Sequence, residues 1–277
     1  MISRLAGAVA RGLLVVLLVA TPSLLAPVLA PDNVQVVILL ALAAGALTIS
    51  EYTTSSPSLF EFRAAPPFNR IRFGMLFVTV FLLALLARGG ADPSSVTMFI
   101  HAIGSVVGAA LDFPYSPVRL VVLMLPQDAS VAQVLLVRAA AGLSCLVALV
   151  SLAVFLIAVR LKGWPLHAGD FNVWINLPTF DPTSAGDVVE RLERDSRVNI
   201  TLGFILPFLL PATIRSAASL SGAMTLENPQ TMVWTVAAWA FLPASLFMRG
   251  MAMSRIAALI ERKRKETDSA ESGLVPA

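Results

Sequence analysis

The chain has 277 residues, of which 57% are hydrophobic and only 13% are charged, whereas soluble domains carry about 25% charged residues. Its net charge of +3 is small and its basic residues gather beside apolar segments, which argues against a nucleic-acid-binding protein. Cys145 is the only cysteine, so no disulfide can form within the chain. Composition therefore favours a protein of the lipid bilayer over a soluble one.

Six apolar segments are long enough to be membrane spans, because about 20 mostly apolar residues cross about 30 Å of hydrocarbon. They are residues 12–30, 34–50, 71–90, 131–159, 200–220 and 231–248. The polar connections are too short to form a second folded domain. The sequence therefore predicts an all-α polytopic helical membrane bundle, with one transmembrane domain over residues 1–265 and a disordered tail over 266–277.

The connections between the predicted spans differ in their content of Lys and Arg. Residues 51–72 and 160–199 carry several arginines, whereas residues 31–33 and 221–230 carry neither Lys nor Arg. Cytoplasmic loops hold the excess of basic residues in membrane proteins. We therefore expect a protein of the bacterial inner membrane, with the two basic loops and both termini in the cytoplasm.

Two segments leave alternatives open. The N-terminus imitates a secretory signal peptide, but Pro31 directly after the cleavage-like sequence disfavours cutting, so we expect a retained first span. Between the third and fourth spans lie two further apolar stretches, 95–111 and 118–125, and the second is too short to cross. We interpret this region as an outward-facing interfacial or re-entrant segment, because apolar runs shorter than a span are often of this kind.

Signatures of catalysis and of metal binding are missing from the sequence. No P-loop, dinucleotide-binding glycine motif, Gly-x-Ser-x-Gly or His-Glu-x-x-His occurs. The two histidines, His101 and His167, are predicted on opposite sides of the membrane, so we expect no metal site and no cofactor. If the protein were a membrane-embedded enzyme, Glu51 and Glu61 would be the best carboxylate candidates.

Two arginines lie inside predicted spans, where burying a charge costs several kcal/mol. Arg138 lies about two turns into the fourth span, and Arg215 lies near the outer end of the fifth. Their long side chains can extend to the headgroups. In the alternative interpretation they face an outer cavity or bind an anionic group, and Asp112 is then the expected partner.

Prolines and small residues mark other places in the spans. Pro207 and Pro211 each remove a backbone donor, so we expect them to bend or unwind the fifth span, as in transporters that build ion sites from broken helices. Gly104 and Gly108 repeat at a spacing of four, which favours close helix packing. Packing within the chain is favoured over packing against another subunit.

The predicted loop 160–199 is more ordered than a passive linker needs to be. It contains four large aromatic residues, and it ends in a short capped helix after Pro182 that carries an apolar stripe and acid-before-base pairs. Aromatic residues are enriched at interface hot spots. The residues that we expect to bind a partner are Trp164, Phe171, Trp174, Phe180 and Leu192. The membrane surface is the alternative contact for these side chains.

Together these features favour a non-enzymatic role. We expect a subunit or assembly factor of a larger membrane complex, whose partners are the lipid bilayer and other membrane-protein subunits. The first alternative is a small-solute or ion transporter that uses a proline-broken fifth helix. The second is a membrane-embedded enzyme.

Overall fold

The computed structural model describes residues 2–25, 31–54, 59–63, 65–161, 164–165, 176–177, 180, 186–221 and 226–271. Its helices are α1 (Ile2–Leu25), α2 (Pro31–Thr53), α3 (Phe68–Arg88), α4 (Ser95–Leu111), α5 (Pro117–Val122), α6 (Val131–Leu161), α8 (Val188–Ser221) and α9 (Pro229–Glu271). Within these ranges the chain is helical and contains no strand. Six helices, α1, α2, α3, α6, α8 and α9, are long and apolar enough to cross a membrane, which confirms the predicted fold class.

The last two spans are longer than the sequence suggests. Helix α8 begins at Val188, so the helix predicted in loop 160–199 is continuous with the fifth span. Helix α9 continues to Glu271, so the prediction of a disordered tail is wrong for residues 266–271, whereas 272–277 lie outside the described residues. No Gly or Pro interrupts residues 188–202 or 251–271, and such stretches can stay helical beyond the apolar part.

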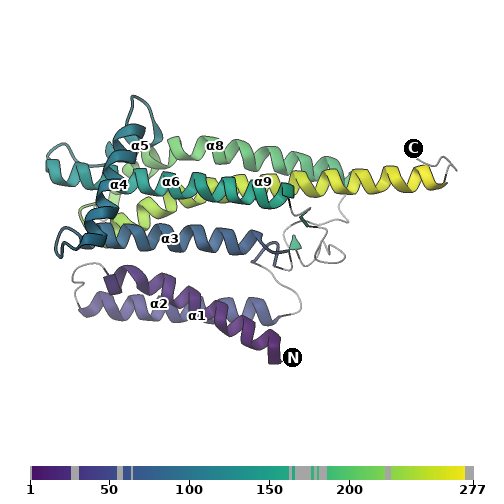
Figure 1. Cartoon of the computed structure of the whole chain (residues 1–277), viewed down its shortest axis with the longest axis horizontal. Coiled ribbons are helices and arrows are strands. Elements are labelled where there is room, and N and C mark those ends of the chain that lie inside the picture. Colours follow the sequence, from purple (N-terminus) through teal and green to yellow (C-terminus); the bar gives the residue numbers. More distant parts are fainter. Residues whose placement is uncertain are drawn as a thin grey trace.

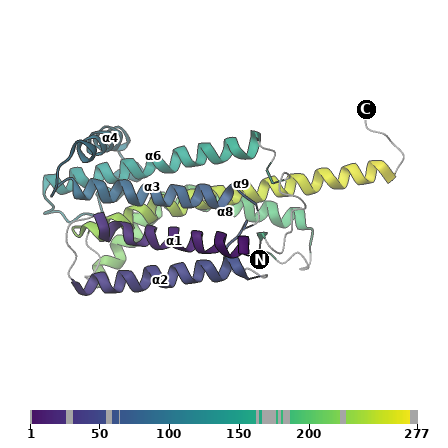
Figure 2. The ribbon, with the colours of Figure 1, turned by 60° about the horizontal axis from the view of Figure 1, so that its bottom comes forward.

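Helix α9 is the centre of the bundle and contacts α1, α3, α6 and α8 (Figures 1 and 2). Its most extensive contact is with α8, where glycines let the backbones approach closely. A Cβ on Gly203 would lie 2.9 Å from the Pro243 carbonyl oxygen, and one on Gly250 would lie 2.9 Å from that of Ser196. Such small-residue contacts provide van der Waals attraction in lipid, where the hydrophobic effect does not drive helices together. Helices α1 and α2 form a hairpin that packs against α3 through α1.

Helix α4 lies across one end of the bundle (Figure 1) and is seen almost end-on in Figure 2. It packs on α6 at its two glycines, and Gly142 of α6 is so close that an added Cβ would lie 2.5 Å from Gly108 Cα. Packing within the chain, the favoured interpretation of Gly104 and Gly108, is therefore confirmed. The other face of α4 exposes apolar residues, namely Val96, Met98, Phe99 and Val106. A 17-residue helix with this orientation is not one of the six candidate spans.

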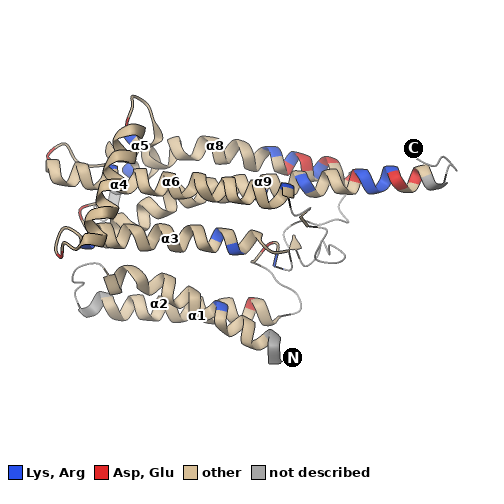
Figure 3. Cartoon of the chain, in the orientation of Figure 1, with Lys and Arg blue, Asp and Glu red and all other residues tan. Residues whose placement is uncertain are grey.

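Charged residues gather at the end of the bundle opposite α4 (Figure 3). We call it the basic end, and the other the α4 end. The basic end carries Arg70 and Arg72 of α3, Arg160 of α6, Arg191, Arg194 and Arg197 of α8, and Arg255, Arg262, Lys263, Arg264 and Lys265 of α9. The difference in Lys and Arg content between alternate loops is thus also a difference between the two ends of the folded bundle.

Candidate functional site

A partly buried ion pair joins three segments at the basic end. Arg249 of α9 holds Glu61 by two hydrogen bonds, Nε to Oε2 at 2.6 Å and Nη2 to Oε1 at 2.8 Å. Its Nη1 also donates to Asn199 Oδ1 of α8 at 3.0 Å. Two-point arginine–carboxylate pairs are among the strongest hydrogen-bonded contacts in proteins. This pair therefore fixes residues 59–63 to the α8–α9 contact.

The two carboxylates that an enzyme could use are both engaged in such structural contacts. Glu61 is held by Arg249, and Glu51 is buried and accepts a hydrogen bond from the Leu59 amide at 3.1 Å. Arg63 Nη1 donates to the backbone carbonyl oxygens of Glu51 and Thr54. This arrangement ties the end of α2 to the following loop, so both carboxylates have structural partners.

A buried aromatic cluster lies beside this ion pair. The ring of Trp164 lies 5.6 Å from that of Phe62 and 6.1 Å from that of Phe155, and Phe68 contacts both phenylalanines. The Trp164 indole N–H donates to the Ala65 carbonyl oxygen at 3.2 Å. Aromatic pairs in this geometry add about 0.5–1.5 kcal/mol beyond their buried area. The cluster is thus a packing core between α3, α6 and the loops.

This packing corrects part of the predicted docking surface. Trp164, Phe180 and Leu192 are at most 5% exposed and belong to the hydrophobic core of the chain itself. They are therefore not available to a partner, and their aromatic and apolar character serves internal packing. Phe171 and Trp174 lie outside the described residues.

Beyond Ala257, α9 leaves the bundle as a single charged helix. We call residues 258–271 the α9 arm, which projects past every other element in Figure 1. Pairs along the arm join Arg262 to Glu266 and Lys265 to Glu261, each at 2.8 Å. Two residues of the arm contact the body: Ile260 packs against the hydrophobic core, and Arg264 Nη1 lies 2.7 Å from Asp187 Oδ1. The hydrogen bond from Arg264 holds the pKa of the Asp187 carboxyl below its ordinary value.

The α4 end brings together the polar residues that the sequence placed in or near the membrane. Asp112 is only 6% exposed, and its Oδ1 lies 2.8 Å from Arg119 Nε and its Oδ2 3.7 Å from Arg138 Nη1. The expected contact between Asp112 and Arg138 is therefore present. Arg215 instead donates from Nη1 to the Leu123 carbonyl oxygen of α5 at 2.8 Å. Arg119 was not predicted as a site residue, because its apolar stretch is too short to be interpreted as a span.

The prolines of α8 do not break it. The helix continues through Pro207 and Pro211, so it does not unwind there, whereas the predicted bend stays a prediction. Pro211 has no N–H for the carbonyl of Pro207, four residues earlier. That oxygen instead accepts a hydrogen bond from the Trp239 indole N–H of α9 at 3.0 Å. One of the two carbonyl oxygens that the prolines leave free is thus used in helix packing.

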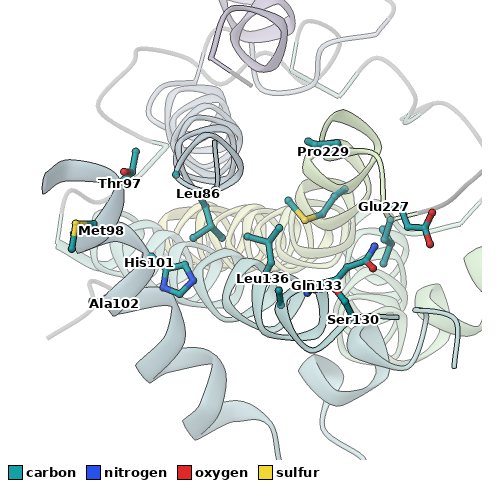
Figure 4. A pocket seen from close by; sticks show the side chains of 15 residues that line it. Leu86, Thr97, Met98, His101, Ala102, Ser130, Gln133, Leu136, Glu227 and Pro229 are labelled. Carbon is teal, nitrogen blue, oxygen red and sulfur yellow. Dashed lines mark hydrogen bonds between the residues drawn. The ribbon is translucent and has the colours of Figure 1, made fainter. Parts of the chain in front are cut away.

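A pocket of about 760 Å³ opens at the α4 end between α3, α4, α6 and the start of α9. Figure 4 shows His101 and Glu227 on opposite sides of it, with Leu136 and Gln133 between them. His101 Nδ1 lies 3.2 Å from Ser105 Oγ, so this nitrogen is engaged within α4. The described part of the chain contains no group of three His, Cys, Asp or Glu placed to hold a metal. His167 lies outside that part, so the expected absence of a metal site remains a prediction.

Two residues of the contact around Glu61, Arg249 and Asn199, were not predicted from the sequence. Arg249 directly follows the predicted sixth span, and Asn199 directly precedes the fifth. An ionisable residue in a run that stays apolar on both sides is a signal of an internal contact, and Arg249 fits it because Met251, Met253 and Ile256 follow. No family model, curated protein or solved structure matches the chain.

Proposed function

We propose that the chain is a subunit or assembly factor of a larger complex in the bacterial inner membrane, and that the α9 arm contacts a partner subunit. The observation that carries the proposal is the arm itself. Helix α9 has 43 residues, or about 65 Å at 1.5 Å per residue, whereas the hydrocarbon layer is about 30 Å thick. A bundle that served only to cross the membrane would not need this extension.

The orientation follows from the charges. The basic end carries most of the Lys and Arg of the chain, and cytoplasmic segments hold the excess of these residues. We therefore place the basic end, the α9 arm and both termini in the cytoplasm. The arm continues along the long axis of the bundle (Figure 1), which carries its basic residues away from the headgroups and favours a protein contact over a lipid one.

The arm is exposed and has little support from its own chain. Its side chains from Glu261 to Asp268 are exposed, and the last buried residue before it is Ala257. Isolated helices of this length are marginal in water, and each charge pair along the arm contributes about 0.2–0.5 kcal/mol. A partner that packs against the arm would supply the missing stabilisation.

A truncation tests this proposal. We expect a chain that ends at Ala257 to insert and fold, because the arm contacts the body mainly through Ile260 and Arg264, but to be lost from its assembly. Native gel mobility of mild-detergent extracts measures the assembly, and circular dichroism checks the fold. The matched control is Met98→Ser, an exposed change at the α4 end.

A photo-crosslinking amino acid in place of Lys263 should join the chain to one defined partner, whereas the same group in place of Met98 should not. A full-length chain that runs as a monomer would overturn the subunit proposal. A truncated chain that keeps the full-length assembly would overturn the role of the arm.

A further inference from the structure

Three arginines lie at one corner of the α4 end, around Asp112 and α5. Arg119 and Arg138 share the single carboxylate of Asp112. Arg215 reaches the same short helix, α5, and its recorded contact is a backbone carbonyl oxygen. Asp92, in the connection between α3 and α4, is paired with Arg88 at 2.7 Å. Among the described residues, Asp112 is therefore the one carboxylate within ion-pair distance of Arg119 and Arg138.

One guanidinium donor at this corner is buried without an acceptor. Arg138 Nε is buried and has no hydrogen-bond partner in the described chain. Arg119 is 42% exposed, and its recorded contact is the one from Nε to Asp112. Asp112 Oδ1, although close to Arg119 Nε, lacks hydrogen-bond geometry. An unpaired buried donor costs about 1–3 kcal/mol, so an anionic ligand at this corner would be stabilising.

The surroundings indicate the level of the lipid headgroups. Phe113 and Tyr115, which lie between Asp112 and α5, are both more than half exposed. Next to them, α4 lies across the bundle end and exposes an apolar face. Aromatic side chains and helices of this kind occupy the membrane interface. The acidic group that is abundant at this level is the lipid phosphate, and its geometry suits the planar arginine fork.

We propose that Arg119 and Arg138, with Arg215 beside them, bind a phosphate group at the α4 end, supplied by the headgroup of an anionic lipid. Asp112 positions the two guanidinium groups and leaves part of their charge for the ligand. The site is independent of the proposed contact of the α9 arm, which lies at the opposite end of the bundle.

The test is a binding titration of the full chain in mild detergent, followed by native mass spectrometry. The probes are phosphatidylglycerol, phosphatidylcholine and inorganic phosphate. We expect phosphatidylglycerol to bind at least about tenfold more tightly than phosphatidylcholine, or about 1.4 kcal/mol. Arg119→Gln should remove most of this preference, and Arg215→Gln a smaller part. Arg88→Gln, which removes an exposed arginine at the same end, is the matched control.

Each probe distinguishes a source of the phosphate. A preference for phosphatidylglycerol that falls with Arg119→Gln supports the lipid site. Binding of inorganic phosphate that falls with the same change supports the phosphate site but assigns it a soluble ligand. Equal binding by the wild-type chain, Arg119→Gln and Arg215→Gln overturns the proposal. Arg215→Gln keeps the test decisive if Arg119→Gln fails to fold, which thermal unfolding would reveal.

Discussion

At the basic end Glu61 takes two hydrogen bonds from a single arginine, whereas at the α4 end Asp112 is shared by Arg119 and Arg138. The first arrangement closes on itself and links the loop 59–63 to α8 and α9. The second leaves the buried Arg138 Nε without an acceptor in the described chain. The Glu61 pair therefore holds the fold together, whereas the Asp112 contacts leave positive charge that a ligand can use, although the basic end also contains an unpaired buried donor, Arg72 Nε.

Breaking the ion pair at the basic end should have the largest effect. Arg249→Gln leaves the Glu61 carboxylate, which is only 13% exposed, without its partner. We expect a loss of about 3 kcal/mol, the low end of the cost of breaking a buried pair, measured as a lower Tm in mild detergent. Arg262→Gln removes the same charge from an exposed pair of the α9 arm and should leave the Tm unchanged. Equal shifts in the two variants would contradict the structural role of Arg249.

The α4 end is held by close packing instead, so a methyl group should damage it. In Gly142→Ala the new Cβ would meet the Gly108 backbone at 2.5 Å, and overpacking of this kind costs about 1–3 kcal/mol. Gly74→Ala is the matched control, because nothing lies within 4 Å of its added Cβ and alanine favours a helix by up to about 1 kcal/mol. We expect the Tm to fall in the first variant and to stay equal or rise in the second. A tolerated Gly142→Ala would mean that α4 does not pack on α6 as described.

Between the two ends, the Pro207 carbonyl depends on a single side-chain donor. Trp239→Phe removes that donor, and leaving the oxygen unpaired should cost about 1–2 kcal/mol. Trp234→Phe, on the same helix, serves as a control for loss of ring volume.

Pro211→Ala restores a backbone N–H for the Pro207 carbonyl, so Trp239→Phe should cost less in that background. A double-mutant cycle measures this coupling directly. Additive effects of the two changes would show that the hydrogen bond from Trp239 does not replace the one that Pro211 removes.

Predictions from the sequence were most successful where a local pattern of residues determines the structure. The six apolar runs are six helices of spanning length in the structure. Predictions failed where residues far apart in the chain determine the structure. Glu61 and Arg249 are 188 positions apart, and Trp164 packs against rings from two other segments. A helix was predicted before the fifth span, but not its continuity with that span in α8, and the extension of α9 was missed, because a polar helix beyond the membrane gives no hydropathy signal.

The smallest expected effect concerns the contact that joins the α9 arm to the body. The hydrogen bond from Arg264 lowers the pKa of Asp187, helped by the charge of Arg264 and by the backbone amides of Val189 and Glu190. The pKa of Asp187 is lower in the folded chain than in the unfolded chain, where it is about 3.9. The ionised carboxyl therefore stabilises the fold fully above that unfolded pKa, and this stabilisation is lost as the pH falls through the folded pKa. We therefore expect the small Tm difference between wild type and Asp187→Asn to be constant from pH 7 to pH 5 and to vanish only below the ordinary carboxyl range.

A spin label at position 263 should be equally mobile in Asp187→Asn at every pH, but should become more mobile in the wild-type chain only in that acidic range. Glu266→Gln removes a carboxylate from the arm without touching Asp187 and should leave the wild-type pH profile intact. A Tm difference that disappears already above pH 5 would contradict the lowered pKa and, with it, the anchoring of the arm by Arg264.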